Sequence, residues 1–156
     1  MDRAIQELKT FGGYEVKIGI EIEFALLDAK TMQPIDHGID CNLSLLMNLV
    51  DDFHDLYMKL KDHDINIEAI HKECGFGQYE MVMNYGDLKK TLDDYYLSRE
   101  IITQHFRKKG LIASFLPKPF ANSMGNGAHI HLSLWKNGKN ITGDLTTEHQ
   151  ISKEGE

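Results

Sequence analysis

Cysteine and long apolar stretches are both scarce in this chain of 156 residues. Its two cysteines, Cys41 and Cys74, are too few for a disulfide framework and lack the CxxC spacing of a zinc ribbon. A reduced, cytoplasmic setting is the simplest expectation. No apolar run approaches the ~18–20 residues that a membrane-spanning helix needs, so we expect no membrane partner.

Positive charge is also in deficit, with 17 Lys+Arg against 24 Asp+Glu and a net charge of -7. Proteins that bind nucleic acid without sequence preference need Lys and Arg to displace counterions from phosphates, so we expect no nucleic-acid partner. An acidic chain is better suited to holding cations. The position of the carboxylates in the fold therefore decides what this acidic chain can do.

The remaining composition, 42% hydrophobic and 26% charged, is typical of one globular domain. Apolar periodicity and turn residues predict an α+β fold: a mainly antiparallel sheet with helices packed on one face. The expected elements are a helix over 2–11, strands over 14–27, 65–72, 78–84, 111–116 and 128–135, and helices over 42–60 and from Asp87 to Gly110. Residues 28–42 are expected to form a loop or loose hairpin, and 141–156 a disordered polar tail.

Three segments place ionisable side chains on predicted strands, where charge is unusual. In the first, Glu21 and Glu23 are two residues apart, so their carboxylates point to the same face, opposite an apolar one. Like charges at this spacing raise each other's pKa unless a cation lies between them. A solvent-exposed strand face is the alternative interpretation.

The second segment carries Glu68, Glu73 and Glu80 around a glycine-rich break at Gly75 and Gly77. The glycines would let the chain fold back, so that Glu73 and Glu80 face one site. A hairpin with polar edges explains the pattern equally well.

The third segment, from Gly125 to Leu134, places His129, His131 and Ser133 on one face of a strand that follows a glycine loop. Two imidazoles side by side suit a metal ion or a phosphate, although surface histidines are common.

Together the three segments provide five candidate metal ligands: Glu21, Glu23, Glu73, Glu80 and His129. Carboxylate oxygens with one imidazole suit Mg²⁺ or Mn²⁺, and two such ions would balance four carboxylates. Two divalent ions beside a glycine loop indicate phosphoryl transfer from a nucleotide.

These motifs, in this order, resemble the catalytic domain of the glutamine synthetase family. They are Gly-Ile-Glu-Ile-Glu-Phe at 19–24, His-Lys-Glu at 71–73, Gly-Gln-Tyr-Glu at 77–80, Pro-Lys-Pro at 117–119 and Gly-Asn-Gly-Ala-His-Ile-His-Leu-Ser-Leu at 125–134. The resemblance runs from about Tyr14 to Asn140. It implies an ATP-dependent ligase that joins ammonia to glutamate through γ-glutamyl phosphate, with ATP, glutamate and ammonia as its partners.

The resemblance also implies roles for individual residues. Glu23, Glu73 and Glu80 would bind the tighter metal ion, and Glu21 and His129 the second, which bridges the ATP phosphates. Nucleotide-contacting positions would be Glu68, Tyr85, His131 and Ser133, and Gly125 would lie in the loop that approaches the amino-acid substrate.

Departures from the family pattern leave two alternatives. Met124 stands where glutamine-forming members often have Asn, and Asn126 replaces a common Ser. A ligase that glutamylates another amine, or a non-catalytic structural or interaction protein, would share the metal motifs.

The family also has an N-terminal β-grasp domain and later phosphate-gripping arginines that residues 1–156 lack. We therefore expect 1–156 to be part of a catalytic domain, inactive and monomeric alone, from a parent that forms ring-shaped homo-oligomers.

Overall fold

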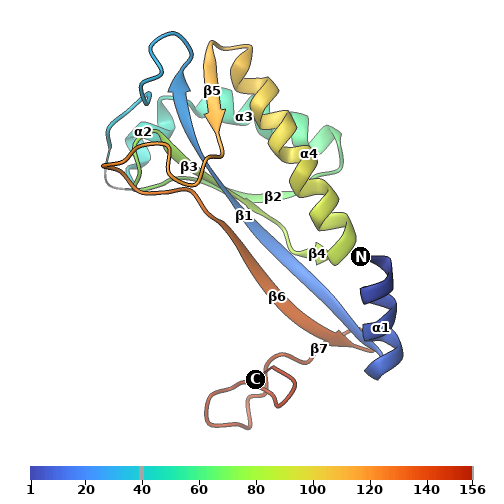
Figure 1. Ribbon diagram of the computed structural model, residues 1–156. Coiled ribbons are helices and arrows are strands. Elements are labelled where there is room, and N and C mark those ends of the chain that lie inside the picture. Colours follow the sequence, from blue (N-terminus) through green and yellow to red (C-terminus); the bar gives the residue numbers. More distant parts are fainter. Residues whose placement is uncertain (39–40, 156) are drawn as a thin grey trace.

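The structure is a computed structural model that describes residues 1–38 and 41–155; residues 39–40 of the predicted loop and Glu156 of the predicted tail lie outside the described residues. It confirms the α+β class with an antiparallel sheet (Figure 1). The elements are α1 (Asp2–Gly12), β1 (Tyr14–Asp28), α2 (Leu43–Met47), α3 (Val50–Asp62), β2 (Ile67–Lys72), β3 (Gln78–Met83), β4 (Gly86–Asp87), α4 (Leu88–Arg107), β5 (Leu111–Ser114), β6 (Ala128–Lys136) and β7 (Lys139–Asn140). Among these described helices, none is both long and apolar enough to cross a membrane.

Strand β1 is the centre of the sheet, whose main order is β2-β3-β1-β6-β7. One edge of β1 pairs with β3 and β4, and its other edge pairs with β6 and then β5, always antiparallel. Because β1 is 15 residues long, it contacts four other strands along its length. The three segments whose strands were predicted to carry ionisable side chains therefore lie on β1 itself or at most two strands away from it.

The period-two pattern of β1 determines which face the helices cover. Its apolar side chains are almost completely buried against α3 and α4, which lie next to each other in the upper half of Figure 1. Phe24 on β1 and Tyr79, its partner on β3, meet Phe53 of α3 and Phe106 of α4 in one aromatic cluster. The opposite face of β1 is left for the polar side chains.

The sequence signals for helix ends and for the tight turn are confirmed by the structure. Gly13 ends α1 in the left-handed conformation, and the Asp87 side chain accepts hydrogen bonds from the backbone N–H groups of Lys89 and Lys90 at the start of α4. Asn137 and Gly138 both have positive φ in the tight turn between β6 and β7.

The predicted single helix over 42–60 is wrong, because the structure divides it into α2 and α3. Asn42 caps α2 as expected, by accepting from the backbone N–H of Ser44. The chain breaks at Asn48 and Leu49; both helices then pack on β2, and α3 packs on α4 as well. Beyond β7, residues 141–155 form a series of turns with one isolated bridge between Gly143 and Ile151.

Candidate metal and nucleotide site

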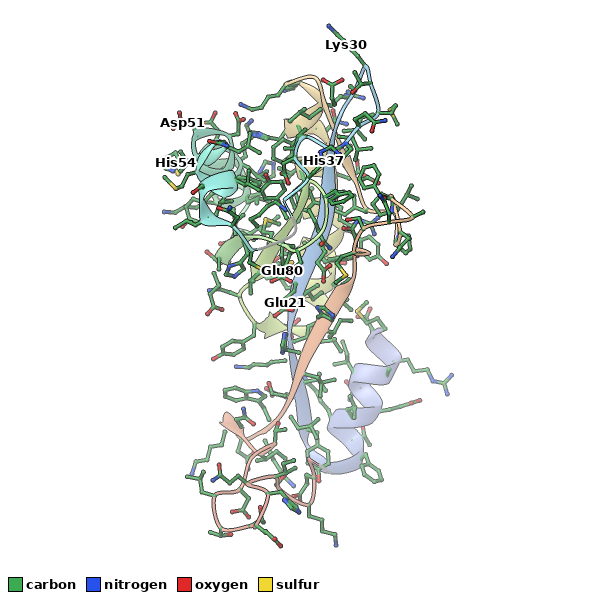
Figure 2. All side chains as sticks on the ribbon, turned by 90° about the vertical axis from the view of Figure 1, so that its left-hand side faces the viewer. Glu21, Lys30, His37, Asp51, His54 and Glu80 are labelled. Atoms are coloured by element: carbon green, nitrogen blue, oxygen red, sulfur yellow. The ribbon has the colours of Figure 1, made fainter. Side chains whose placement is uncertain are left out.

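Glu21, Glu80 and His129 converge on the polar face of the sheet, each from a different strand. In the register of β1 and β6, Glu21 lies opposite His129, and in that of β1 and β3, Glu23 lies opposite Glu80. Side chains opposite each other on antiparallel strands share a face. One ligand atom from each of Glu21, Glu80 and His129 lies within 4.8 Å of the others, and Figure 2 shows Glu21 and Glu80 side by side.

Glu21 is the residue of this cluster that both histidines contact. Its Oε2 lies 3.2 Å from Nδ1 of His129, and its Oε1 lies 2.8 Å from Nε2 of His131. Both imidazoles are about two-thirds exposed, whereas the Glu21 side chain is 24% exposed. The cluster thus has a carboxylate at its base and two imidazoles toward solvent.

Glu23 is held more rigidly, by two amide donors. Its Oε2 accepts from Nε2 of Gln78 at 2.8 Å and from the backbone N–H of Gly127 at 3.0 Å. This leaves Oε1 facing the cluster, 3.4 Å from Nδ1 of His129. A Cβ at Gly127 would lie 3.2 Å from that oxygen, so glycine allows the close approach of the loop.

Gln78 is a site residue to which the sequence reasoning gave no role, although it stands in the Gly-Gln-Tyr-Glu motif. Its amide is buried and makes three hydrogen bonds of 2.8 Å: it accepts from the N–H of Gly75 and donates to Glu23 and to the carbonyl of Gly125. Gly125 is packed tightly, since a Cβ there would lie 2.5 Å from the carbonyl oxygen of Pro117. Gln78 therefore connects Glu23, beside the carboxylate cluster, to the loop that was predicted to approach the substrate.

The charges of the cluster indicate that it suits a cation. Burial, followed by repulsion from Glu21, Glu73 and Glu23, raises the pKa of Glu80 above its ordinary value. A divalent ion would remove both the repulsion and the burial penalty of the ionised form. Oxygen donors with imidazole fit Mg²⁺ or Mn²⁺.

Glu73 is the predicted ligand that lies apart from this cluster. Its carboxylate groups instead with Cys41 and Cys74, with one ligand atom of each within 4.8 Å of the others. It remains near enough to contribute to the repulsion on Glu80. The structure thus brings together Glu21, Glu80 and His129, with Glu23 bordering them, and places Glu73 at the margin.

Three of the four predicted nucleotide-contacting residues, Tyr85, His131 and Ser133, line one hollow of about 390 Å³ beside the cluster. Two of its other lining residues, Trp135 and Lys17, carry chemistry that was not predicted. Trp135 stacks with Tyr85 at a ring separation of 6.3 Å, and Nζ of Lys17 lies 3.8 Å from the centre of a Trp135 ring. The alternation of side chains along β6 could have predicted Trp135, because it places Trp135 on the same face as His131 and Ser133.

Glu68 lies elsewhere. It is exposed on β2 at an irregularity in the pairing with β3, and it lines a different hollow with residues of α2 and α3. The structure therefore does not join Glu68 to the other three nucleotide positions.

Comparison with known proteins identifies the family of the chain. The sequence profile described as "Glutamine synthetase, catalytic domain" matches residues 1–156. The chain belongs to the glutamine synthetase family. The type-1 glutamine synthetase 1 of Dictyostelium discoideum is 32% identical over 97% of this chain, and the glutamine synthetase of Methanocaldococcus jannaschii is 33% identical over 86%. The alignments cover 33% and 31% of those two proteins, so the chain spans about a third of the length of these glutamine synthetases.

Solved structures give the same result for the fold. The complex of GmaS with ADP superposes with a TM-score of 0.86 at 27% identity, covering 97% of this chain and 36% of the GmaS chain. A structure described as a novel glutamine synthase homolog has a TM-score of 0.87 at 24% identity, and covers 99% of this chain and 36% of that one. The curled antiparallel sheet is therefore that of the family's catalytic domain.

Proposed function

We propose that this chain provides the metal- and nucleotide-binding face of a glutamine-synthetase-type ligase. The reaction of the whole protein is the ATP-dependent joining of ammonia to glutamate through γ-glutamyl phosphate, in the cytoplasm. One observation carries the proposal: His131 contacts Glu21 of the carboxylate cluster and also lines the aromatic hollow. A cation-binding cluster and a hollow for a nucleotide thus share one residue.

Different residues would bind the metal ions and the nucleotide, as phosphoryl transfer requires. Glu21, Glu23, Glu80 and His129 would hold two Mg²⁺ or Mn²⁺ ions, with Glu73 contributing from the margin, and bound ions would neutralise the phosphates of ATP. Gln78 and the N–H of Gly127 orient Glu23. Tyr85 and Trp135 offer flat aromatic surfaces, Ser133 a hydroxyl, and Lys17 a positive charge, toward a nucleotide in the hollow.

The nucleotide assignment gains support from GmaS, a relative that was solved with ADP. On this proposal Gly125, tied to Gln78, lies on the amino-acid side of the site. Glu68 would reach a nucleotide only after a change in the course of β2, and it is the weakest of the proposed contacts.

Metal binding tests the first half of the proposal. Titration calorimetry of Mn²⁺ into the chain should show saturable binding, and Glu21→Gln should weaken it by about tenfold or more, because a ligand charge is lost. Glu15→Gln changes an exposed carboxylate on the same strand and should leave the affinity unchanged. Equal affinities in the two variants would contradict the site.

Nucleotide binding tests the second half. Trp135 is the single tryptophan of the chain and lies in the hollow, so its fluorescence should change as Mg²⁺–ATP binds. Tyr85→Ala should weaken the response, since stacking on an aromatic ring is worth about 1–3 kcal/mol per base. Tyr96→Ala, at an exposed position on α4, is the control. An unchanged spectrum at saturating ATP would refute the assignment of the hollow.

We also propose that residues 1–156 alone are monomeric and form no glutamine, whereas the whole protein assembles into a ring. The imidazoles of the cluster stay exposed in this chain, and water would compete at the reacting centre. Phosphate release with glutamate and ammonia, and size-exclusion chromatography, would test these statements; glutamine formation by the chain alone would contradict them.

A second candidate is the same ligase chemistry with another amine or amino acid. The observation that favours it is Met124, an exposed apolar side chain next to Gly125 in the proposed substrate loop. Phosphate release by the whole protein with methylamine in place of ammonia would distinguish the two. The absence of release with any amine would instead favour a non-catalytic role.

A further inference from the structure

Cys41 and Cys74 are far apart in the sequence but lie against each other in the fold. Their Sγ atoms are 3.3 Å apart, and both thiols are free. Cys41 is exposed just before α2, and Cys74 is half-buried in the turn between β2 and β3. A disulfide bond is about 2.05 Å long, so the two sulfur atoms need to move about 1.2 Å closer to bond.

We propose that Cys41 and Cys74 form an oxidisable dithiol that closes to an intramolecular disulfide beside the metal site. Proximity alone distinguishes this pair from two ordinary surface thiols, since each sulfur already has its reaction partner in contact. The turn that carries Cys74 also contains Gly75 and Gly77, and glycine in a turn eases the small backbone adjustment that closure requires.

The reaction balances with a small-molecule disulfide, such as oxidised glutathione, as the oxidant. Cys41 is the more exposed thiol; it loses its proton and attacks the oxidant, forming a mixed disulfide and releasing one glutathione thiolate. Cys74 then loses its proton and attacks Sγ of Cys41, which releases the second glutathione. Two cysteine S–H bonds and the S–S bond of oxidised glutathione break, one Sγ–Sγ bond and two glutathione S–H bonds form, and the two electrons and two protons end on two molecules of reduced glutathione.

The position of Cys74 connects this reaction to the proposed metal site, and this part of the inference rests on the proposed function. Glu73 precedes Cys74 and groups with the two thiols. Gly75 follows Cys74 and donates its N–H to the side chain of Gln78, which in turn holds Glu23. A covalent bond from Cys74 to Cys41 would keep Glu73 on the α2 side and restrain the turn that orients Gln78.

Intact mass spectrometry tests the dithiol. The chain is treated with excess oxidised glutathione, and the remaining thiols are alkylated with N-ethylmaleimide. We expect a monomer lighter by two hydrogens that carries neither adduct, because the second thiol resolves the mixed disulfide at high effective concentration. Cys41→Ser and Cys74→Ser should each stop at a glutathione adduct.

Other outcomes overturn the dithiol. Stable glutathione adducts on both cysteines of the unmodified chain, or disulfide-linked dimers, would show that the sulfur atoms do not react with each other. One zinc ion retained through gel filtration, with both thiols still reduced after the glutathione treatment, would instead assign the pair to a metal site.

Mn²⁺ affinity, measured on the oxidised and the reduced chain, tests the link to the metal site separately. We expect oxidation to weaken binding by about tenfold, a typical effect of disturbing residues that support a metal site. The double Cys→Ser variant should show no response to the oxidant. Unchanged affinity in a chain that mass spectrometry shows to be oxidised would overturn the link. Failure of the reduced chain to bind Mn²⁺ would count against the proposed function and leave the dithiol standing.

Discussion

Gln78 offers the sharpest test of how this site is held together. Replacing Gln78 by Ala removes three hydrogen bonds of 2.8 Å from a buried position: one to the Glu23 carboxylate and two to backbone groups of Gly75 and Gly125. A hydrogen bond to a charged group contributes about 1.5–3 kcal/mol, and a neutral one about 0.5–1.5 kcal/mol. We therefore expect Gln78→Ala to lower the free energy of unfolding by about 4 kcal/mol.

That loss is large against the total stability of about 5–15 kcal/mol that is usual for a domain. Urea denaturation followed by circular dichroism measures the change, and the melting temperature should fall by about 10 °C. Gln33→Ala removes the same side chain from an exposed loop and should change the stability very little. A loss below about 1 kcal/mol in Gln78→Ala would refute the role assigned to the amide.

Three further predictions concern the core, a helix cap and the charge cluster. Phe24→Ala should destabilise the chain by about 3–5 kcal/mol in urea denaturation, since Phe24 is completely buried in the aromatic cluster; a loss near that of a surface mutation would contradict this. Asp87→Ala should cost about 1 kcal/mol through the lost N-cap of α4, whereas Asp93→Ala, at an exposed position within α4, should not. In the metal-free chain the raised pKa of Glu80 means that its ionised form opposes folding, so stability should rise as the pH falls through that pKa. Glu80→Gln should accordingly raise the melting temperature at pH 7, with no gain below the ordinary pKa of a glutamate; a decrease at pH 7 would refute the reasoning.

Local patterns in the sequence predicted most of the fold. The alternation in β1 identified its buried face, the Asn-Gly pair identified the tight turn after β6, and Asp87 identified the start of α4. These features depend on neighbours within a few residues, which is why they can be recognised without the rest of the chain. The break between α2 and α3 was missed, because the chain there has neither proline nor glycine to mark it, and the packing of α3 on α4 as well as on β2 is a tertiary contact.

The sequence by itself determined which residue types were available for chemistry: carboxylates two residues apart on one strand, an HxH on another, and glycines around both. Strand register decided which of them meet. It placed Glu21 opposite His129 and left Glu73 beside the two cysteines. It also brought Gln78 within reach of Glu23, 55 positions away along the chain. Register between distant strands follows from the packing of the whole sheet against its helices, and only the tertiary structure contains that information.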